Sequence, residues 1–221
     1  RHSPPGTNPC ALNNGKCDHF CLNKPNTYVC ACQVEYELAA DQKSCIIPDA
    51  FLILYSGNHI RRVSTQSSYS ETLPISGITS ISAIDVNVAD FRLYWADNHL
   101  RTINRAFLNG SRFEKVVSFG LHSPESLAID WVSSNLYWTD TGIRRIEVAR
   151  LNGQCRRTLF WNNLNEPRNL VLDPREGYMF WSEWADEWGS IIKASMDGKT
   201  RHAVISNIGR VNGLTIDYTR R

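Results

Sequence analysis

The cysteines are the residues of this 221-residue chain whose type and spacing most clearly carry chemistry. Six of the seven lie within the first 45 residues. These six are Cys10, Cys17, Cys21, Cys30, Cys32 and Cys45. A segment this small cannot build an adequate hydrophobic core, so disulfide bonds are its expected source of stability. Spacing alone leaves many pairings open, but such a cluster implies an oxidising compartment, either secretory or at the cell surface.

Zinc binding is the alternative chemistry for this cluster. A single residue separates Cys30 from Cys32, whereas the cysteines of a typical zinc site are about two to four residues apart. His19 is the only histidine inside the cluster. We therefore expect no metal site and assign these cysteines to disulfides.

Residues suited to catalysis form no recognisable pattern. The chain contains neither a Gly-x-Ser-x-Gly sequence nor a phosphate-cradling loop, and its histidines lack metal-ligand spacing. The histidines are His2, His19, His59, His99, His122 and His202. The formal net charge is only +2, with acidic and basic residues interspersed, which argues against binding to nucleic acid. No apolar run approaches the roughly 18 residues of a membrane span. We therefore expect no enzymatic activity, no cofactor and no nucleic-acid partner.

A tetrapeptide repeats along the rest of the chain. Tyr-Trp-Thr-Asp occupies residues 137–140, and related sequences lie 43 residues before and 43 residues after it, at 94–97 and 180–183. Each copy follows an apolar stretch that ends in Asp and precedes an Asn-Gly or Asp-Gly dipeptide. A further apolar stretch at 215–217, which ends at Asp217, is expected to form the first strand of a fourth unit. A fixed period of this length is the signature of stacked units that cannot bury their apolar faces alone.

Short strands must position these repeated residues. The strands expected in one unit lie at about 126–130, 136–139, 144–150 and 155–160. They are rich in Ile, Val, Leu, Tyr and Trp, whereas a helical repeat would need apolar residues at i, i+3, i+4 and i+7. The pattern predicts an all-β fold of β-propeller blades, with the motif Tyr and Trp in the core. The motif acids are expected to bond to backbone or to a neighbouring Arg; they are Asp97, Asp140 and Glu183.

Strand parity divides the loops between two faces. In an up-and-down blade, the second loop and the loop between blades open on one face, which we name the crossover face. The first and third loops open on the other, the hairpin face. The crossover face is expected to contain residues 121–125, 161–169, 182–190 and 208–212. Its aromatic and arginine side chains are of the types that protein-binding hot spots favour. Arg168 and Trp184 are expected on this face, in adjoining blades.

The cysteine cluster, with Asn13-Asn14-Gly15 between its first two cysteines, resembles an EGF-like module over residues 9–47, after a linker at 1–8. The disulfides that this resemblance implies are Cys10–Cys21, Cys17–Cys30 and Cys32–Cys45. Glu35 departs from the family, which usually places Gly before the aromatic residue that is Tyr36 here. The residues before the first cysteine lack the acidic cluster of calcium-binding modules, so no calcium is expected.

An EGF-like module next to Tyr-Trp-Thr-Asp repeats resembles the low-density-lipoprotein receptor and its relatives. The segments that narrow the resemblance are 144–153, 166–168 and 209–214. They look most like the Wnt co-receptor branch, whose insect member is called Arrow, and most like its third propeller with the EGF-like module that closes the second. The resemblance implies a six-bladed propeller, of which residues 48–221 would supply about four blades and be truncated at the C-terminus. It also implies the extracellular part of a single-pass plasma-membrane protein.

In that branch, secreted ligands and antagonists dock on the crossover face. The positions that match the family's contact motifs are Glu125, Arg168, Trp184, Arg210 and Asn212. The implied partners are Wnt-type ligands, Dickkopf-type antagonists, a Frizzled-type co-receptor acting through the full-length protein, and a folding chaperone of the secretory pathway. Ser123 stands where the family often has Tyr. Two alternatives stay open: an endocytic lipoprotein-type receptor with acid-triggered release, and a matrix-linker propeller of the nidogen type.

Two further residues are candidates for modification or reactivity. Asn109 is the acceptor of the sequence Asn-Gly-Ser, which predicts a glycan on the hairpin face, opposite the candidate ligand site. Cys155 has no partner in the cysteine cluster. We expect it to be a free thiol tucked into a sheet rather than one half of a bridge to another chain.

Overall fold

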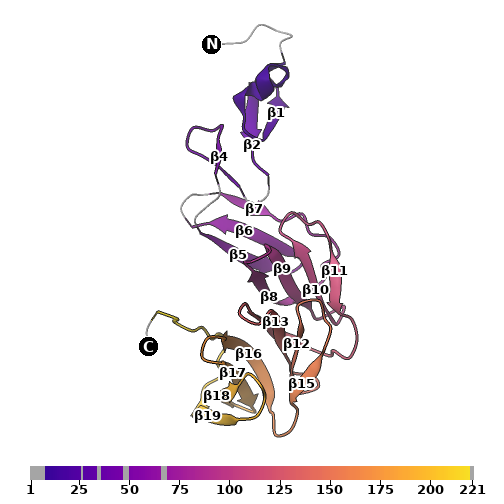
Figure 1. Ribbon diagram of the computed structural model, residues 1–221, viewed down its shortest axis with the longest axis vertical. Coiled ribbons are helices and arrows are strands. Elements are labelled where there is room, and N and C mark those ends of the chain that lie inside the picture. The colour runs from indigo at the N-terminus through magenta and orange to yellow at the C-terminus, as the bar shows by residue number, and fades with distance from the viewer. Residues whose placement is uncertain (1–7, 26, 34–35, 47–49, 66–68, 220–221) are drawn as a thin grey trace. The chain divides into compact units, whose positions relative to one another are not determined.

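A computed structural model describes residues 8–25, 27–33, 36–46, 50–65 and 69–219 (Figure 1). The chain divides into two compact units. One comprises Arg1–Leu54 with His59–Pro74, and the other comprises Tyr55–Asn58 with Ile75–Arg221. The domain boundaries expected after residues 8 and 47 stay predictions, because residues 1–7 and 47–49 lie outside the described part of the chain.

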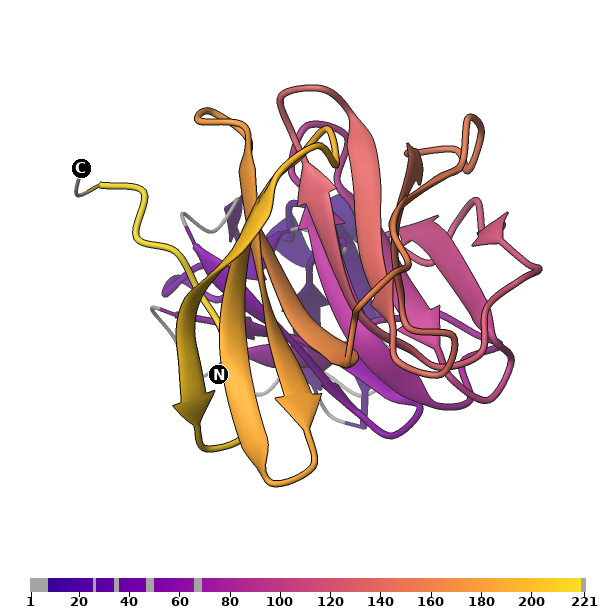
Figure 2. The same ribbon diagram turned by 90° about the horizontal axis from the view of Figure 1, so that it is seen from below.

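The second unit contains three four-stranded antiparallel sheets, each with its strands in sequence order (Figure 2). The first blade is β8 (Ile81–Asn87), β9 (Arg92–Asp97), β10 (Thr102–Phe107) and β11 (Glu114–Val117). The second blade is β12 (Pro124–Asp130), β13 (Asn135–Asp140), β14 (Arg145–Arg150) and β15 (Arg157–Phe160). The third blade is β16 (Glu166–Asp173), β17 (Tyr178–Ala185), β18 (Trp188–Ser195) and β19 (Arg201–Ile208). The prediction of an all-β fold built from up-and-down blades is confirmed.

The core of the second unit lies between neighbouring blades. Trp95, Trp138 and Trp181, one from each motif, are fully buried. One cluster of buried residues joins the first blade to the second, and another joins the second to the third, where Phe160 packs on Trp181 with ring centroids 5.4 Å apart. Because each blade contributes one wall of such a cluster, no blade buries its aromatic residues alone. The predicted core role of the motif aromatics is confirmed.

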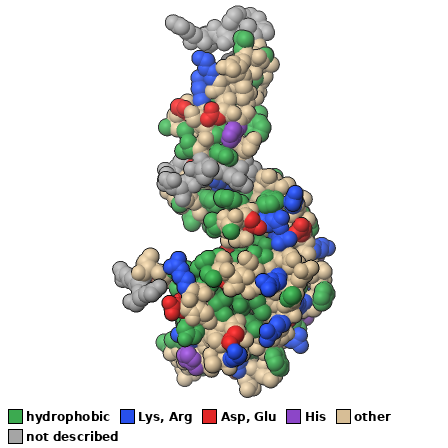
Figure 3. Space-filling view, viewed as in Figure 1, with side chains coloured by type: hydrophobic (Ala, Val, Ile, Leu, Met, Phe, Trp, Pro, Cys, Tyr) green, Lys and Arg blue, Asp and Glu red, His purple; other side chains and the backbone are tan. Residues whose placement is uncertain are grey.

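The face drawn in Figure 3 shows cationic and anionic side chains interspersed among polar and apolar ones. The described residues include no α-helix, only two short 3₁₀ helices, η1 (Pro9–Ala11) and η2 (Asn13–Lys16). Among these residues, no helix has the length and apolar character needed to cross a membrane.

The first unit begins with two small sheets. Strand β1 (Phe20–Lys24) pairs with β2 (Thr27–Ala31), and β3 (Glu37–Leu38) pairs with β4 (Cys45–Ile46). Gly15 lies between the first two cysteines with φ +61°, and a Cβ there would stand 2.7 Å from the Cys21 sulfur. The Asn-Asn-Gly sequence is therefore explained by a left-handed turn pressed against a disulfide.

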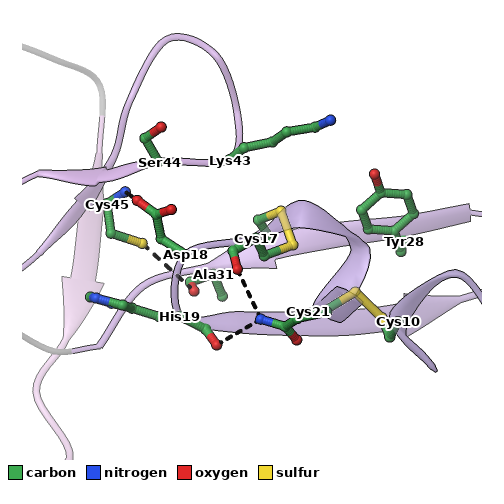
Figure 4. Close-up of a disulfide and its surroundings, with 12 residues drawn as sticks. Cys10, Cys17, Asp18, His19, Cys21, Tyr28, Ala31, Lys43, Ser44 and Cys45 are labelled. Atoms are coloured by element: carbon green, nitrogen blue, oxygen red, sulfur yellow. Dashed lines mark hydrogen bonds between the residues drawn. A yellow bond between two sulfur atoms is a disulfide. The ribbon is translucent and has the colours of Figure 1, made fainter. Parts of the chain in front are cut away.

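Three disulfides join Cys10–Cys21, Cys17–Cys30 and Cys32–Cys45, which are the pairs that the EGF-like resemblance implies. Figure 4 shows the Cys10–Cys21 bridge and its surroundings. The backbone N–H of Cys45 donates to Asp18 Oδ2 at 2.9 Å, so a side chain from the first half of the module fixes the last cysteine. His19 lies within 4.8 Å of both Cys32 and Cys45. Those sulfurs are bonded to each other and cannot act as thiolate ligands in this state.

The first unit also contains most of a three-stranded sheet. Its order is β5 (Phe51–Ser56), β6 (His59–Ser64) and β7 (Ser70–Thr72), with the end of β5 counted in the second unit. The Arg62 side chain is fully buried, stacks over Phe51 at 4.7 Å and lies 3.5 Å from the Glu71 carboxylate. A buried cation needs such partners to offset its loss of hydration.

Two expectations are corrected. Cys155 is free but exposed, because it precedes β15 in a turn with φ +56° instead of lying within the sheet. A strand was also expected over 215–217, but residues 209–219 contain none. The first, or inner, strand of each of the other blades pairs with the second strand of its own sheet, and the described residues include no second strand for this segment.

Candidate functional site

The motif acids hold the crossover-face loops together. Asp97 accepts hydrogen bonds from the backbone N–H groups of Thr79, Ser80 and Leu100 at 2.8–3.2 Å. It thereby joins the segment entering β8 to the loop between β9 and β10. Burial disfavours ionisation of the Asp97 carboxyl, but these bonds and one from the Thr79 hydroxyl outweigh it and keep the pKa below its ordinary value.

Asp140 repeats this arrangement in the second blade. Its carboxylate accepts from the N–H groups of His122 and Ser123 on the entering segment and of Gly142 and Ile143 on the β13–β14 loop. The expected bonding of the motif acids to backbone is confirmed at both aspartates. Both aspartates therefore have a structural role, and Asp140 holds the segment that leads to the candidate contact residue Glu125.

Arg168 is the centre of an ion-pair network between two blades. Its Nη1 lies 2.8 Å from Glu125 Oε1 and its Nη2 lies 3.1 Å from Glu166 Oε2. Glu125 starts the inner strand β12 of the second blade, whereas Glu166 and Arg168 start the inner strand β16 of the third. The Arg168 side chain is 22% exposed, so its pairs remain within reach of solvent and of a partner.

Trp184 contacts two guanidinium groups. The Arg168 guanidinium carbon is 3.7 Å from the ring centroid, and that of Arg210 is 5.1 Å away. The indole N–H donates to the Val211 carbonyl at 3.0 Å. Arg210 also donates through Nε to the Asp186 carbonyl at 3.2 Å, which ties the segment after β19 to the β17–β18 loop. The result is a pre-formed stack of one indole and two arginines.

The structure gathers most of the sequence-predicted site. Glu125, Arg168, Trp184 and Arg210 meet through the contacts above, all on loops and strand ends of the second unit. Asn212 is exposed and follows Val211, the residue whose carbonyl accepts from Trp184. Whether these residues contact a ligand stays a prediction.

One detail of the predicted site is wrong. Arg168 and Trp184 belong to the same blade and not to adjoining blades, because β16 pairs with β17 and places Glu166 opposite Trp184. The linker between the second and third blades, residues 161–165, ends before Arg168. This arginine therefore lies in β16, the first strand of the sheet that contains the third motif. The partner from the adjoining blade is Glu125.

Sequence reasoning also missed the role of Glu166. This residue pairs with Arg168 from two positions earlier on the same strand. Residues two apart on a strand point to the same side, so the Glu-x-Arg spacing was the available signal. The β-bulge between Pro167 and Leu170 could not be predicted from the Glu-x-Arg spacing.

The second unit also has a cavity away from these residues. It measures about 680 Å³ and is lined mainly by apolar residues of the inner strands β8, β12 and β16, together with Trp131 and Tyr218. Asp85 is its one lining carboxylate, and burial raises the pKa of this group. Its oxygens accept from the N–H groups of Val86 and Ile129, so this acid joins inner strands and has a structural role.

Comparison with known families identifies the repeats. The low-density lipoprotein receptor repeat class B matches residues 92–131, 134–174 and 177–218, which together make up more than half of the chain. The chain belongs to the low-density lipoprotein receptor-related family. Residues 10–45 of the chain match a second family, the coagulation Factor Xa inhibitory site.

Relatives of this receptor-related chain are long proteins. Low-density lipoprotein receptor-related protein 5 of human and mouse is 54% identical over 214 residues, which cover 96% of this chain and 13% of the relative. Low-density lipoprotein receptor-related protein 4 of rat is 41% identical over 128 residues, covering 57% of this chain and 7% of the relative. The chain thus spans only a small part of these relatives. It is an extracellular receptor-related segment, similar to the Wnt co-receptor branch.

Solved structures support the same architecture. The crystal structure of a nidogen/laminin complex superposes with a TM-score of 0.70 at 31% identity, covering 76% of this chain and 66% of that one. A hydrazine synthase from Kuenenia stuttgartiensis superposes with a TM-score of 0.54 at 11% identity, covering 66% and 43%. The second likeness concerns the fold alone.

Proposed function

We propose that this chain is a ligand-binding segment of a Wnt co-receptor, and that its crossover face binds Wnt-type ligands and Dickkopf-type antagonists. The observation that carries the proposal is the contact of the Trp184 ring with both Arg168 and Arg210, with Arg168 paired to Glu125. The 54% identity to receptor-related protein 5 across nearly the whole chain supports it. A Frizzled-type co-receptor and a secretory chaperone are further partners that the family suggests for the full-length protein.

The geometry suits recognition of a loop from a partner protein. Arginine and tryptophan dominate binding hot spots, and here both are held in place before a partner arrives. Such pre-organisation lowers the conformational entropy that binding must remove. The two arginines and two glutamates of the network balance in charge, so affinity would depend on stacking and directed hydrogen bonds more than on long-range attraction.

The experiment is a binding measurement with purified Wnt and a purified Dickkopf-type antagonist on the secreted protein. Arg168→Ala and Trp184→Ala should each weaken binding by about 2 kcal/mol or more. Arg112→Ala, an exposed arginine next to the Asn109 turn, is the matched control and should bind normally. Normal binding by both site variants in a folded protein would reject this site.

An endocytic receptor is the second candidate function. His122 supports it, because the exposed imidazole lies on the crossover face with Nδ1 3.1 Å from the Ser123 hydroxyl. Histidine is the side chain that changes charge between neutral and endosomal pH. Release of the antagonist at pH 5.5 but not at pH 7.4, abolished in His122→Gln, would favour this candidate; retention at both values would favour the co-receptor.

A further inference from the structure

An arginine of the second blade holds the linker that enters that blade. The linker 118–123 runs from the outer strand β11 to the inner strand β12. Arg156 donates through Nη1 to the Phe119 carbonyl at 2.6 Å and through Nη2 to the Gly120 carbonyl at 3.0 Å. Its guanidinium carbon also lies 5.4 Å from the Phe119 ring centroid. One side chain thus satisfies two carbonyls of a segment that has no strand partner.

Arg156 is itself held in place by a buried carboxylate. The Glu147 carboxylate, almost fully buried, accepts from Arg156 Nη2 at 2.7 Å and from Nε at 3.3 Å. The Thr158 hydroxyl also donates to Glu147 at 3.1 Å. The guanidinium carbon stands 5.4 Å from the ring centroid of the buried Trp138. A planar guanidinium with five donors can make these four hydrogen bonds to the carboxylate and both carbonyls together, whereas an ammonium group has only three donors.

The third blade repeats the contact. Arg201 occupies the position of Arg156, four residues after the start of the turn dipeptide, and donates through both Nη atoms to the Asn162 carbonyl at 3.1 Å. In each linker the clamped segment contains a residue in the left-handed region, Gly120 at φ +65° and Asn163 at φ +51°. The first blade differs, because Phe113 stands at this position and packs on Trp95.

These two linkers lead directly into the candidate binding residues. The first continues to Glu125 and the second to Glu166 and Arg168. We infer that Arg156 and Arg201 are positioning residues for the crossover face: each holds its linker so that the inner strand presents its first charged side chains in the geometry that binds a partner. The expected effect of these arginines on partner binding rests on the proposed function. Their effect on the order of the linkers can be measured without any ligand.

The test compares Arg156→Ala with Arg157→Ala in the full chain. The control removes the same charge one residue away, from an exposed side chain. Hydrogen–deuterium exchange of residues 118–125 should accelerate in Arg156→Ala alone, with the other blades unchanged. Association with a purified Dickkopf-type antagonist should become slower, and affinity should fall about tenfold, because the linker must then be ordered on binding. Arg156→Lys should not restore either property.

The outcomes separate the two proposals. Unchanged exchange at 118–125 in a folded Arg156→Ala protein overturns the clamp. Faster exchange with unaltered antagonist affinity overturns its positioning role. If the parent protein does not bind the antagonist, the proposed function fails while the exchange result still decides the clamp. Should Arg156→Ala fail to be secreted, Arg201→Ala provides the same test at residues 161–165, because its guanidinium lacks a buried carboxylate like Glu147 behind it.

Discussion

The indole Nε1 of Trp181 donates a hydrogen bond of 2.8 Å to Glu183 Oε1 within the third motif. The other oxygen of Glu183 lies 3.4 Å from the Asn165 N–H. In the other two motifs the acid is aspartate, one methylene shorter, and the Nε1 atoms of Trp95 and Trp138 have no hydrogen-bond partner among the described residues. Glu183, which replaces the aspartate of the other motifs, therefore accepts a hydrogen bond from the buried indole N–H of its own motif. The aspartates of the other two motifs accept none from theirs.

Glu183→Asp should lower the free energy of unfolding by about 1–3 kcal/mol, the cost of leaving a buried donor unpaired. Denaturant unfolding followed by tryptophan fluorescence measures this difference. Asp140→Glu is the reciprocal variant, and it tests whether a longer acid can reach Trp138. A Glu183→Asp protein as stable as the parent would show that the indole bond contributes little.

Acid sensitivity should depend on Asp97. Its folded-state pKa is below the ordinary value, so its contribution to stability is complete above pH 4 or so and declines as the pH falls through the folded-state value. Asp97→Asn should be less stable at pH 7 and should lose less further stability between pH 5 and pH 2. Urea unfolding across this range provides the measurement. Asp90→Asn, which removes a carboxylate at an exposed site, is the control variant.

Tyr137 should be needed for secretion. Its side chain is 5% exposed, and its hydroxyl donates to the Met196 carbonyl of the next blade at 3.3 Å. Tyr137→Ala opens a cavity in the core between the second and third blades and should cost about 3–5 kcal/mol. Tyr137→Phe removes only the hydrogen bond and should cost about 1 kcal/mol. Secreted yield and thermal unfolding distinguish the two; equal yields would contradict the packing role.

Asn109 should carry an N-linked glycan that does not impair binding. Its Oδ1 accepts from the backbone N–H of Ser111 at 3.0 Å and from the Ser111 hydroxyl at 2.7 Å, in an exposed turn. Asn109→Gln and Ser111→Ala should both abolish the glycan, seen as a loss of mass after expression in animal cells. Loss of antagonist binding in a folded Asn109→Gln protein would show that the hairpin face is not free of ligand.

Cys155 should react with alkylating reagents in the native protein. The residue is free and exposed in the turn before β15, whereas the six cysteines of the first unit are in disulfides. Non-reducing mass spectrometry after native alkylation should find one modified site, and Cys155→Ser should remove it. A cross-linked peptide at this position would instead indicate a bridge to another chain.

The sequence alone was sufficient for the architecture. The period of Tyr-Trp-Thr-Asp copies, the apolar stretches before them and the turn dipeptides after them are local features, and local strand patterns predict up-and-down sheets. Strand parity then predicted that Glu125, Arg168, Trp184 and Arg210 share one face. Parity suffices because each antiparallel strand reverses the chain, so the end at which a loop opens follows from counting strands.

Only the tertiary structure decided how those residues meet. Strand β16 begins at Glu166 and pairs with β17, which places Arg168 in the blade of Trp184, and the bulge between Pro167 and Leu170 shifts the register of this pair. The Arg156 clamp joins residues 36 or more positions apart, and its acceptors are backbone carbonyls that any residue could supply. A contact to backbone leaves no signature in side-chain types. Its existence depends on packing between blades, which a single sequence does not encode in any local pattern.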